Sequence, residues 1–364
     1  MSGHRDPPET PVAAWRIVPF ALPLRRPWAD AHGQVNARRG WLVELRAGER
    51  LGYGECAPLE SAGTESAEEA AAALEVLLDG VSGRPPAEAV GALPPAPGRA
   101  PAARCAVETA LLDLRGQALG LPMAACLGAA PVAALPVNGM LGPARGALAS
   151  LEEALASGYR ILKIKIGVDS WDQEREALAA LVEAVPPGVS LRLDANGAWS
   201  VDEAAGHIRE MAQWPVECLE EPSAEATVRD LLELQALAQF PLALDESLAL
   251  RLPGRIPVRR QVLKPMVCGG PLAVAERARA AEAETVVTTT VDSAVGVWAA
   301  VHAAAAIAGG LEGGARADPG SGLAHGLGTS GWLAADVAEA PNVTGGLIRV
   351  PSAPGLGIRP RVPR

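Results

Sequence analysis

RILKIKI, at residues 160–166, belongs to a series of short β-rich runs in this 364-residue chain. The others are PVNGML (136–141), VSLRLDAN (189–196), VECLEEP (216–222), PLALDES (241–247), QVLKP (261–265) and ETVVTTT (284–290). Helix-start signals follow most of them, such as Gly270 and Pro271 before the helix expected from Leu272. Seven strands alternating with helices indicate parallel βαβ units. Because a closed barrel uses about eight such units in about 250 residues, we predict an α/β barrel.

The composition narrows the class of protein. A net charge of −10 argues against nucleic acid or an anionic membrane as the main partner. The first fifteen residues contain no apolar run typical of a signal peptide. Five cysteines are scattered without a CxxC pair, so neither a disulfide framework nor a zinc site is indicated. We expect a cytoplasmic protein that acts on a small molecule, and the sequence leaves its oligomeric state open.

Charged residues interrupt five of the apolar strands near their C-terminal ends. They are Lys163, Lys165, Asp194, Glu220, Asp245 and Lys264. Buried parallel strands normally read as nearly continuous runs of Val, Ile and Leu. Active sites of such barrels lie at the C-terminal ends of the strands. These side chains are therefore expected to converge on one mouth.

The lysines are informative because only three of the 32 basic residues are lysine, and all three stand at these positions. Lysine can lose its proton where arginine cannot. Lys163 and Lys165 are two apart and point the same way from a strand. Burial and mutual repulsion lower the pKa of such lysines, which favours a base. The alternatives are a solvated strand edge for this pair and a surface loop lysine for Lys264.

The three carboxylates predict a metal site. Two like charges about 4 Å apart repel by roughly 4 kcal/mol at an effective dielectric constant of 20, so Asp194, Glu220 and Asp245 need a cation if they converge. Ligation by a few carboxylate oxygens is typical of Mg²⁺. The alternative is that individual carboxylates cap helices or pair with arginines. The adjoining residues, expected to face away and to support the ligands from behind, are Asn196, Glu221 and Glu246.

The same motifs resemble those of the enolase superfamily, within its muconate-lactonising subgroup. They are KIK (163–165), LDAN (193–196), LEEP (219–222), LDES (244–247) and LKP (263–265), with YGECAPL (53–59) and CAVETALLDLRGQALG (105–120) outside the strand series. The resemblance implies a modified (β/α)₇β TIM-type barrel with an α+β capping domain. We expect the capping domain at residues 12–102, completed by the C-terminal tail 342–364, and the barrel at residues 103–341.

Within the subgroup, three segments are most similar to the o-succinylbenzoate synthases: PVNGML (136–141), TTTVDSAVG (288–296) and AHGLGTSGWLAADV (324–337). The resemblance implies a lyase that dehydrates 2-succinyl-6-hydroxy-2,4-cyclohexadiene-1-carboxylate to 2-succinylbenzoate, a step toward menaquinone or phylloquinone. Mg²⁺, which Mn²⁺ can replace, is expected on Asp194, Glu220 and Asp245. Lys165 is the expected acid–base group, Lys264 the stabilising cation and Lys163 the orienting group. The implied substrate contacts are Asn138, Thr289, Thr290, Ser293 and Gly320.

Three other activities remain open. Lysines on two strands cover both faces of an alpha carbon, which suits an N-acylamino acid racemase, and a cycloisomerase uses the same kind of site. A non-catalytic binding protein with this fold is the remote alternative. Relatives that epimerise dipeptides carry Asp-x-Asp at the eighth strand, a region that we place at ARADPGSG (315–322), where Asp318 stands alone.

Overall fold

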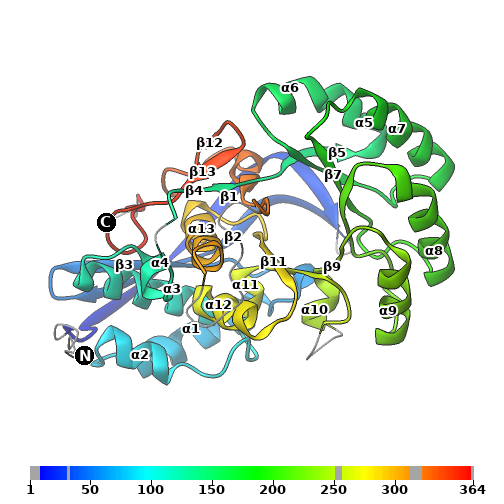
Figure 1. The fold of residues 1–364 in the computed structure, drawn as a ribbon. Coiled ribbons are helices and arrows are strands. Elements are labelled where there is room, and N and C mark those ends of the chain that lie inside the picture. Colours follow the sequence, from blue (N-terminus) through cyan, green and yellow to red (C-terminus); the bar gives the residue numbers. More distant parts are fainter. Residues whose placement is uncertain (1–8, 31–32, 131, 251–255, 311–321, 362–364) are drawn as a thin grey trace, which may run out of the picture.

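Seven parallel strands form the central sheet (Figure 1). In the computed structural model, which describes residues 9–30, 33–130, 132–250, 256–310 and 322–361, each strand pairs with its neighbours along the chain. The strands are β5 (Gly139–Pro143), β6 (Ile161–Lys165), β7 (Ser190–Asp194), β8 (Val216–Glu220), β9 (Leu242–Leu244), β10 (Arg260–Leu263) and β11 (Glu284–Val287). This order is the one predicted from the alternating pattern.

A short closing strand completes the ring between the two edges of this sheet. His325 forms a parallel bridge to Val137, just before β5, and Gly326 forms one to Thr288, just after β11. The eighth strand therefore lies at residues 325–326, and our placement of it at residues 315–322 was wrong. With this closure, the predicted modified (β/α)₇β barrel is confirmed.

Helices cover the outside of the barrel, with α6, α7, α8 and α9 along one side of Figure 1. Their bounds are α5 (Ala144–Ala147), α6 (Leu151–Ala156), α7 (Trp171–Ala184), α8 (Val201–Glu210), α9 (Val228–Leu237), α10 (Glu246–Leu250), α11 (Pro265–Cys268), α12 (Pro271–Ala280) and α13 (Ala294–Ala308). Short 3-10 turns are η2 (Leu148–Ser150), η3 (Met211–Gln213) and η4 (Gly328–Trp332). Ser200 and Glu203 form a capping box at the start of α8, which fixes where that helix begins.

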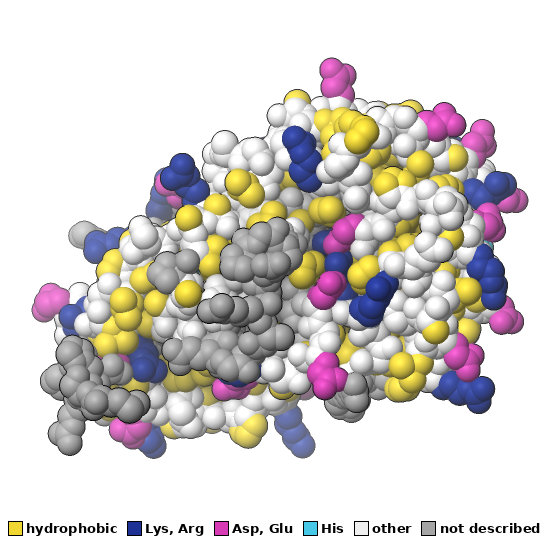
Figure 2. Space-filling model, in the orientation of Figure 1, with side chains coloured by type: hydrophobic (Ala, Val, Ile, Leu, Met, Phe, Trp, Pro, Cys, Tyr) yellow, Lys and Arg dark blue, Asp and Glu magenta, His cyan; other side chains and the backbone are white. Residues whose placement is uncertain are grey.

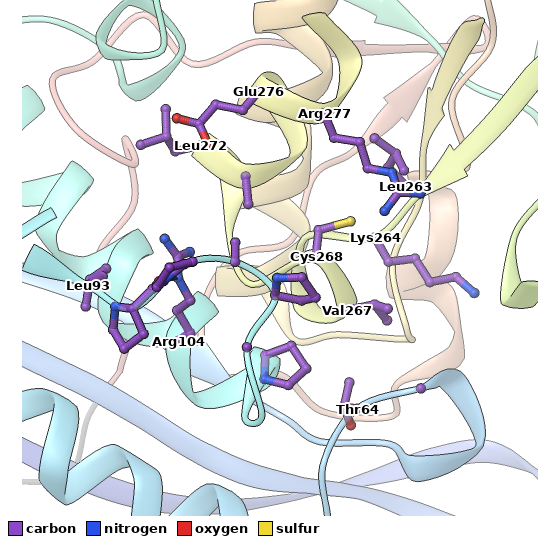
Figure 3. A pocket seen from close by; sticks show the side chains of 18 of the residues that line it. Thr64, Leu93, Arg104, Leu263, Lys264, Val267, Cys268, Leu272, Glu276 and Arg277 are labelled. Atoms are coloured by element: carbon purple, nitrogen blue, oxygen red, sulfur yellow. Dashed lines mark hydrogen bonds between the residues drawn. The ribbon is translucent and has the colours of Figure 1, made fainter. Parts of the chain in front are cut away.

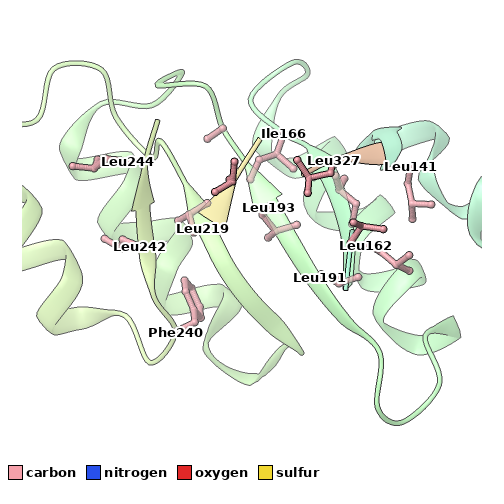
Figure 4. Packing of buried hydrophobic residues seen from close by; sticks show 14 of the residues in the cluster. Leu141, Leu162, Ile166, Leu191, Leu193, Leu219, Phe240, Leu242, Leu244 and Leu327 are labelled. Atoms are coloured by element: carbon pink, nitrogen blue, oxygen red, sulfur yellow. The ribbon is translucent and has the colours of Figure 1, made fainter. Parts of the chain in front are cut away.

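The main hydrophobic core lies between the strands and these helices. Leu162, Leu191, Leu193, Leu219 and Leu242 are fully buried in it (Figure 4). These leucines alternate along β6 and β7 with the charged residues of the strand ends, because successive side chains of a strand point to opposite faces. The outward positions therefore pack against helices, and the inward positions carry the polar groups. Alternation thus places the charged side chains inside the barrel.

The N-terminal region packs against one side of the barrel and forms the predicted α+β capping domain. Its antiparallel sheet consists of β1 (Ala14–Asp30), β2 (Gly33–Ala47) and β3 (Arg50–Cys56), followed by η1 (Glu60–Ala62), α1 (Ala67–Val81), α2 (Pro86–Ala92), α3 (Pro101–Leu119) and α4 (Met123–Cys126). Helix α3 packs closely on β3, where a Cβ at Gly54 would stand 1.9 Å from the Ala106 carbonyl oxygen. The boundary at residues 102 and 103, which falls within α3, stays a prediction.

The C-terminal tail joins a third, antiparallel sheet. This sheet contains β12 (Val343–Thr344), β13 (Leu347–Arg349) and β4 (Ala134–Pro136), so it ties the tail to the segment that leads into β5. Further along, the Leu356 amide donates to Asp113 Oδ1 of α3 at 2.8 Å. Among the described residues, no helix combines the length and apolar character needed to cross a membrane.

Candidate active site

Lys163 and Lys165 lie on β6 and point into the barrel. Lys163 Nζ stands 2.8 Å from Asp194 Oδ2 and 2.8 Å from Glu220 Oε1, so its ammonium joins the ends of β7 and β8. Lys165, at the C-terminal end of the same strand, is exposed and pairs in register with Asp194. The side chain that can reach a substrate is therefore Lys165, whereas Lys163 is held by carboxylates.

The three predicted carboxylates end adjacent strands. Asp194 and Glu220 are register partners at the ends of β7 and β8, and Asp245 follows β9 directly. Lys264 follows β10, and its Nζ stands 2.7 Å from Asp245 Oδ2. All six charged residues predicted from the strand ends are thus brought to one mouth. Figure 2 shows acidic and basic side chains side by side near the centre of this face.

The pKa values of the charged groups at the mouth are set by burial and by their charged neighbours. Burial and the neighbouring Asp194 raise the pKa of the Glu220 carboxyl to about 7. Burial raises the pKa of Asp245 to about 6, and Lys264 opposes that shift. Burial alone would lower the pKa of Lys163, but Asp194 and Glu220 outweigh it and the net pKa is raised. The lowered pKa that we expected for a buried lysine is therefore not found at Lys163, because it lies between two carboxylates.

The chemistry of the three predicted ligands suits a divalent cation. Asp194, Glu220 and Asp245 offer only hard carboxylate oxygens, which suit Mg²⁺. Within the described part of the chain, no three such ligands already converge as a metal centre, since Lys163 stands between two of them and Lys264 holds the third. Buried carboxylates with raised pKa values are groups that a bound cation would stabilise in the ionised form.

Two residues with left-handed backbone shape the turns behind these ligands. They are Asn196 (φ 45°), which follows β7, and Glu221 (φ 43°), which follows β8. A left-handed backbone costs a non-glycine residue of order 1 kcal/mol, and such residues are concentrated at functional sites. The Asn196 amide donates to Asp194 Oδ1 at 3.1 Å, and its side chain reaches Glu246 Oε1 at 3.5 Å. The expected supporting residues therefore adjoin the ligands, although their roles remain predictions.

Buried glutamates anchor the loops that follow the active-site strands, a role that the sequence indicated for Glu221 but not for the others. Glu174 accepts three backbone N–H groups of residues 167–169, just after Lys165. Glu221 accepts the amides of Asp245 and Ser247. Glu108 of α3 accepts the Leu272 amide at the start of α12. Each carboxylate satisfies backbone donors that would otherwise be unpaired, which fixes the path of the loop.

A fourth anchor, Glu55 of β3, holds the start of α13. It accepts hydrogen bonds from the Ser293 amide at 2.8 Å, the Ser293 hydroxyl at 2.5 Å and the Gly296 amide at 2.7 Å. Asp292, in the same loop, is also fully buried and accepts from Thr290. Burial, reinforced by Asp292, raises the pKa of Glu55 to about 7. The nearby Arg38 donates to the Val291 and Ala57 carbonyl oxygens.

The predicted substrate contacts are already engaged with protein groups. Asn138 Oδ1 accepts from Arg192 at 3.3 Å, and Thr289 and Thr329 share a hydroxyl contact of 2.8 Å. Thr290 bonds to Asp292, and Ser293 is fully buried with its hydroxyl on Glu55. Gly320 lies outside the described residues. Substrate binding by these residues stays a prediction.

An ion-pair network fills the barrel below the mouth, and sequence analysis missed it. Glu217 bonds to both Arg192, at 3.0 Å, and Arg260, and Arg260 also pairs with Glu284 at 2.8 Å. Burial, together with the charges of Arg192 and Arg260, lowers the pKa of His325 to about 3 and keeps this imidazole neutral. Alternation could have placed Arg192 and Arg260 inside, since they precede Asp194 and Lys264 by two and four residues.

Comparisons with known proteins agree with this geometry. The family model for enolase C-terminal domain-like proteins matches residues 146–363, and the model for the MenC N-terminal domain matches residues 14–95. The chain is 32% identical over 240 residues to the o-succinylbenzoate synthase of Thermosynechococcus vestitus, covering 64% of this chain and 67% of that protein. It is also 32% identical over 365 residues to the L-Lys-D/L-Arg epimerase of Methylococcus capsulatus, covering 93% and 96%.

A solved structure extends the comparison to the whole fold. The dipeptide epimerase from Methylococcus capsulatus, solved with Mg and the dipeptide L-Arg-D-Lys, superposes with a TM-score of 0.79 at 29% identity. The match covers 96% of this chain and 99% of that one. Synthases and epimerases are thus both relatives of comparable identity, and the comparisons alone leave the reaction open.

Proposed function

This chain belongs to the enolase superfamily, and we propose that it is a lyase of the o-succinylbenzoate synthase type. The reaction is the syn dehydration of 2-succinyl-6-hydroxy-2,4-cyclohexadiene-1-carboxylate to 2-succinylbenzoate, on the route to menaquinone or phylloquinone. The observation that carries the choice of reaction is the closing strand, His325 and Gly326, which is followed by Leu327 and Gly328. Dipeptide-epimerising relatives hold the substrate ammonium there with two aspartates, and this strand end supplies no carboxylate.

Lys165 is the proposed acid–base residue. It is the exposed lysine of the pair, at the C-terminal end of β6. In its neutral form it takes the proton alpha to the substrate carboxylate, and the electron pair moves into the carboxylate-conjugated system. The ammonium so formed then returns that proton to the departing hydroxyl group on the same face, and water leaves as the ring becomes aromatic. One residue thus serves both steps of a syn elimination.

The other charged residues are proposed to hold the cation and to stabilise negative charge on the substrate. Asp194, Glu220 and Asp245 would hold the divalent cation, which when bound supplies positive charge beside the reacting carboxylate. Lys163 fixes the carboxylates of Asp194 and Glu220 in position. Lys264 stands across the mouth from β6 and presents a second ammonium to the negative charge that builds up during proton removal. We propose the supporting roles of Asn196 and Glu246 on the basis of their mutual contact.

The test is a spectrophotometric assay of aromatisation with Mg²⁺ present. Lys165→Ala is expected to lower turnover by at least the roughly 10²–10⁴ typical of a general acid–base group. Lys165→Arg keeps the charge but cannot exchange the proton, so it is expected to fail as well. Arg160→Ala, an exposed residue just before the same strand, is the matched control and should retain wild-type turnover. Wild-type turnover in Lys165→Arg would disprove the proton-transfer role.

An N-acylamino acid racemase is the second candidate, favoured by the positions of the lysines. Lys165 ends β6 and Lys264 follows β10, with the three carboxylate-bearing strands between them. Such a pair can address both faces of an alpha carbon. Deuterium exchange at the alpha carbon of N-succinyl amino acids, without aromatisation of the cyclohexadiene substrate, would establish this reaction in place of the synthase.

A further inference from the structure

Met140 of β5 points into the mouth of the barrel. It is the register partner of Lys163, and side chains of paired residues in neighbouring parallel strands project from the same face. Asn138, two residues earlier, also faces inward, because its side chain bonds to Arg192. The residue between Asn138 and Met140 is a glycine that packs against Tyr159. Alternation and register thus agree on the direction of Met140.

The side chain of Met140 is open to a ligand. It is 48% exposed, whereas the following residue, Leu141, is 6% exposed and belongs to the core between strands and helices. A half-exposed methionine among buried neighbours, at the level of the site lysines, is an apolar surface inside an otherwise polar mouth. Thioether side chains are flexible and adapt well to ring-shaped or branched apolar ligands.

The mouth divides into a charged side and a neutral side. Strands β6 to β10 supply the three carboxylates and three lysines described above. The neutral side consists of β5, which has no charged residue, and the closing strand, which contributes Gly326 and is followed by Gly328 at the start of η4. A Cβ at Gly326 would clash with Thr288 Oγ1 at 2.5 Å, whereas one at Gly328 would meet no atom nearer than 3.7 Å. A methyl group would therefore fit at Gly328 but not at Gly326.

We propose that Met140 determines substrate specificity: the uncharged group attached to the reacting carbon, a carbon ring or an apolar side chain, packs against its thioether. The inference rests on the proposed function, which places the reacting carboxylate on the charged side of the mouth. The remainder of the substrate then lies toward β5 and the closing strand. A substrate with a cationic group at that position would find no carboxylate there among the described residues.

A cavity beside α11 and α12 reaches the mouth at Asp245 and Lys264. It has a volume of about 940 Å³, and its lining combines Thr64, Leu93 and Arg104 with residues of α11 and α12. Figure 3 shows Lys264 at its edge with the side chain directed away from Arg104. Arg104 is itself engaged by Glu108 and the Pro94 carbonyl oxygen. Met140 does not line this cavity, so the two offer a substrate separate surfaces at the mouth.

The test compares Met140→Leu, Met140→Gln and Met140→Glu by calorimetric titration of 2-succinylbenzoate in Mg²⁺. Met140→Gln should weaken binding about tenfold through loss of apolar contact, Met140→Glu more because it adds like charge, and Met140→Leu less than either. Val228→Glu, on the outer helix α9 and 47% exposed, is the matched control and should bind as wild type. Wild-type affinity in Met140→Gln and Met140→Glu would overturn the proposal.

A second measurement separates this inference from the proposed function. If the wild-type chain racemises N-succinyl amino acids and does not aromatise the cyclohexadiene, the synthase assignment fails. KM is then measured for N-succinylphenylalanine and N-succinylalanine in the same variants. The wild-type preference for phenylalanine should collapse in Met140→Gln and Met140→Glu with kcat largely retained. An unchanged preference would overturn the role of Met140, and binding of neither ligand class by the wild type would overturn both proposals.

Discussion

Glu55 makes a pH-dependent contribution to stability that can be isolated by one substitution. The carboxyl is fully buried beside Asp292, and burial raises its pKa from an ordinary value of 4.5 to about 7. Between these two pH values the folded chain binds a proton that the unfolded chain has released. Stability therefore falls as pH rises from about 4.5 to about 7. At about 1.36 kcal/mol for each pKa unit, the loss is about 3 kcal/mol.

Glu55→Gln removes this titration while preserving size and one acceptor oxygen. The wild-type and Glu55→Gln chains should be unfolded with urea at pH 5, 6, 7 and 8, and the free energies of unfolding compared. The variant is expected to be less stable than wild type at pH 5. It should lose about 3 kcal/mol less between pH 5 and pH 8. Buried carboxyls remote from Glu55, such as Asp113 with its pKa raised to about 6 by burial, contribute equally to both chains and cancel in the difference.

The control is Glu75→Gln, because Glu75 is an exposed glutamate on α1. Its pH profile of stability should run parallel to that of wild type. If the Glu55→Gln profile also runs parallel, Glu55 does not change protonation on unfolding in this range. The hydrogen bonds from Ser293 and Gly296 would then hold it ionised, and the reasoning from burial would be refuted.

Three further predictions concern the barrel. Glu217→Gln leaves the buried Arg192 and Arg260 without their shared carboxylate and should lower the free energy of unfolding by about 3 kcal/mol or more in urea titrations. Glu174→Ala removes the hydrogen bonds that hold the loop after Lys165, so kcat should fall by at least about tenfold. Binding of 2-succinylbenzoate should be retained, which steady-state kinetics and calorimetric titration together would show. Chelation with EDTA should abolish dehydration, and either Mg²⁺ or Mn²⁺ should restore it; activity that survives exhaustive chelation would contradict the metal site.

The location of the site was predictable because it depends on local sequence and topology. Charged residues at the ends of successive parallel strands must converge when the sheet closes, and Lys163, Asp194 and Glu220 do so at contact distance. Their pairing was not predictable. Alternation fixes the face on which a side chain lies, whereas the choice of partner depends on strand stagger and rotamer. The position of Lys163 between two carboxylates reverses the pKa shift that burial alone implies.

The closing strand shows why the eighth strand was misplaced. Among the described residues, only His325 and Gly326 form bridges to the flanking segments, and the surrounding sequence AHGLG lacks the β-branched residues found in six of the other seven runs. Two bridges suffice because the edges at Val137 and Thr288 are already held by the rest of the barrel. A strand defined by its neighbours in this way leaves no periodic signal in its own sequence.

The loop anchors show that the capping domain also helps to build the barrel's mouth. Glu108 of α3 holds the start of α12, and Arg104 of the same helix donates to the carbonyl oxygen of Gly269, in the turn after Lys264. Glu55 of β3 holds the start of α13, after the loop with Thr289 and Thr290. Substituting these buried groups should therefore disturb Lys264 and the β11 loop even though neither Glu55 nor Glu108 faces the substrate. Since the partners are 164 to 241 residues apart in the chain, this dependence follows from the fold and not from any local motif.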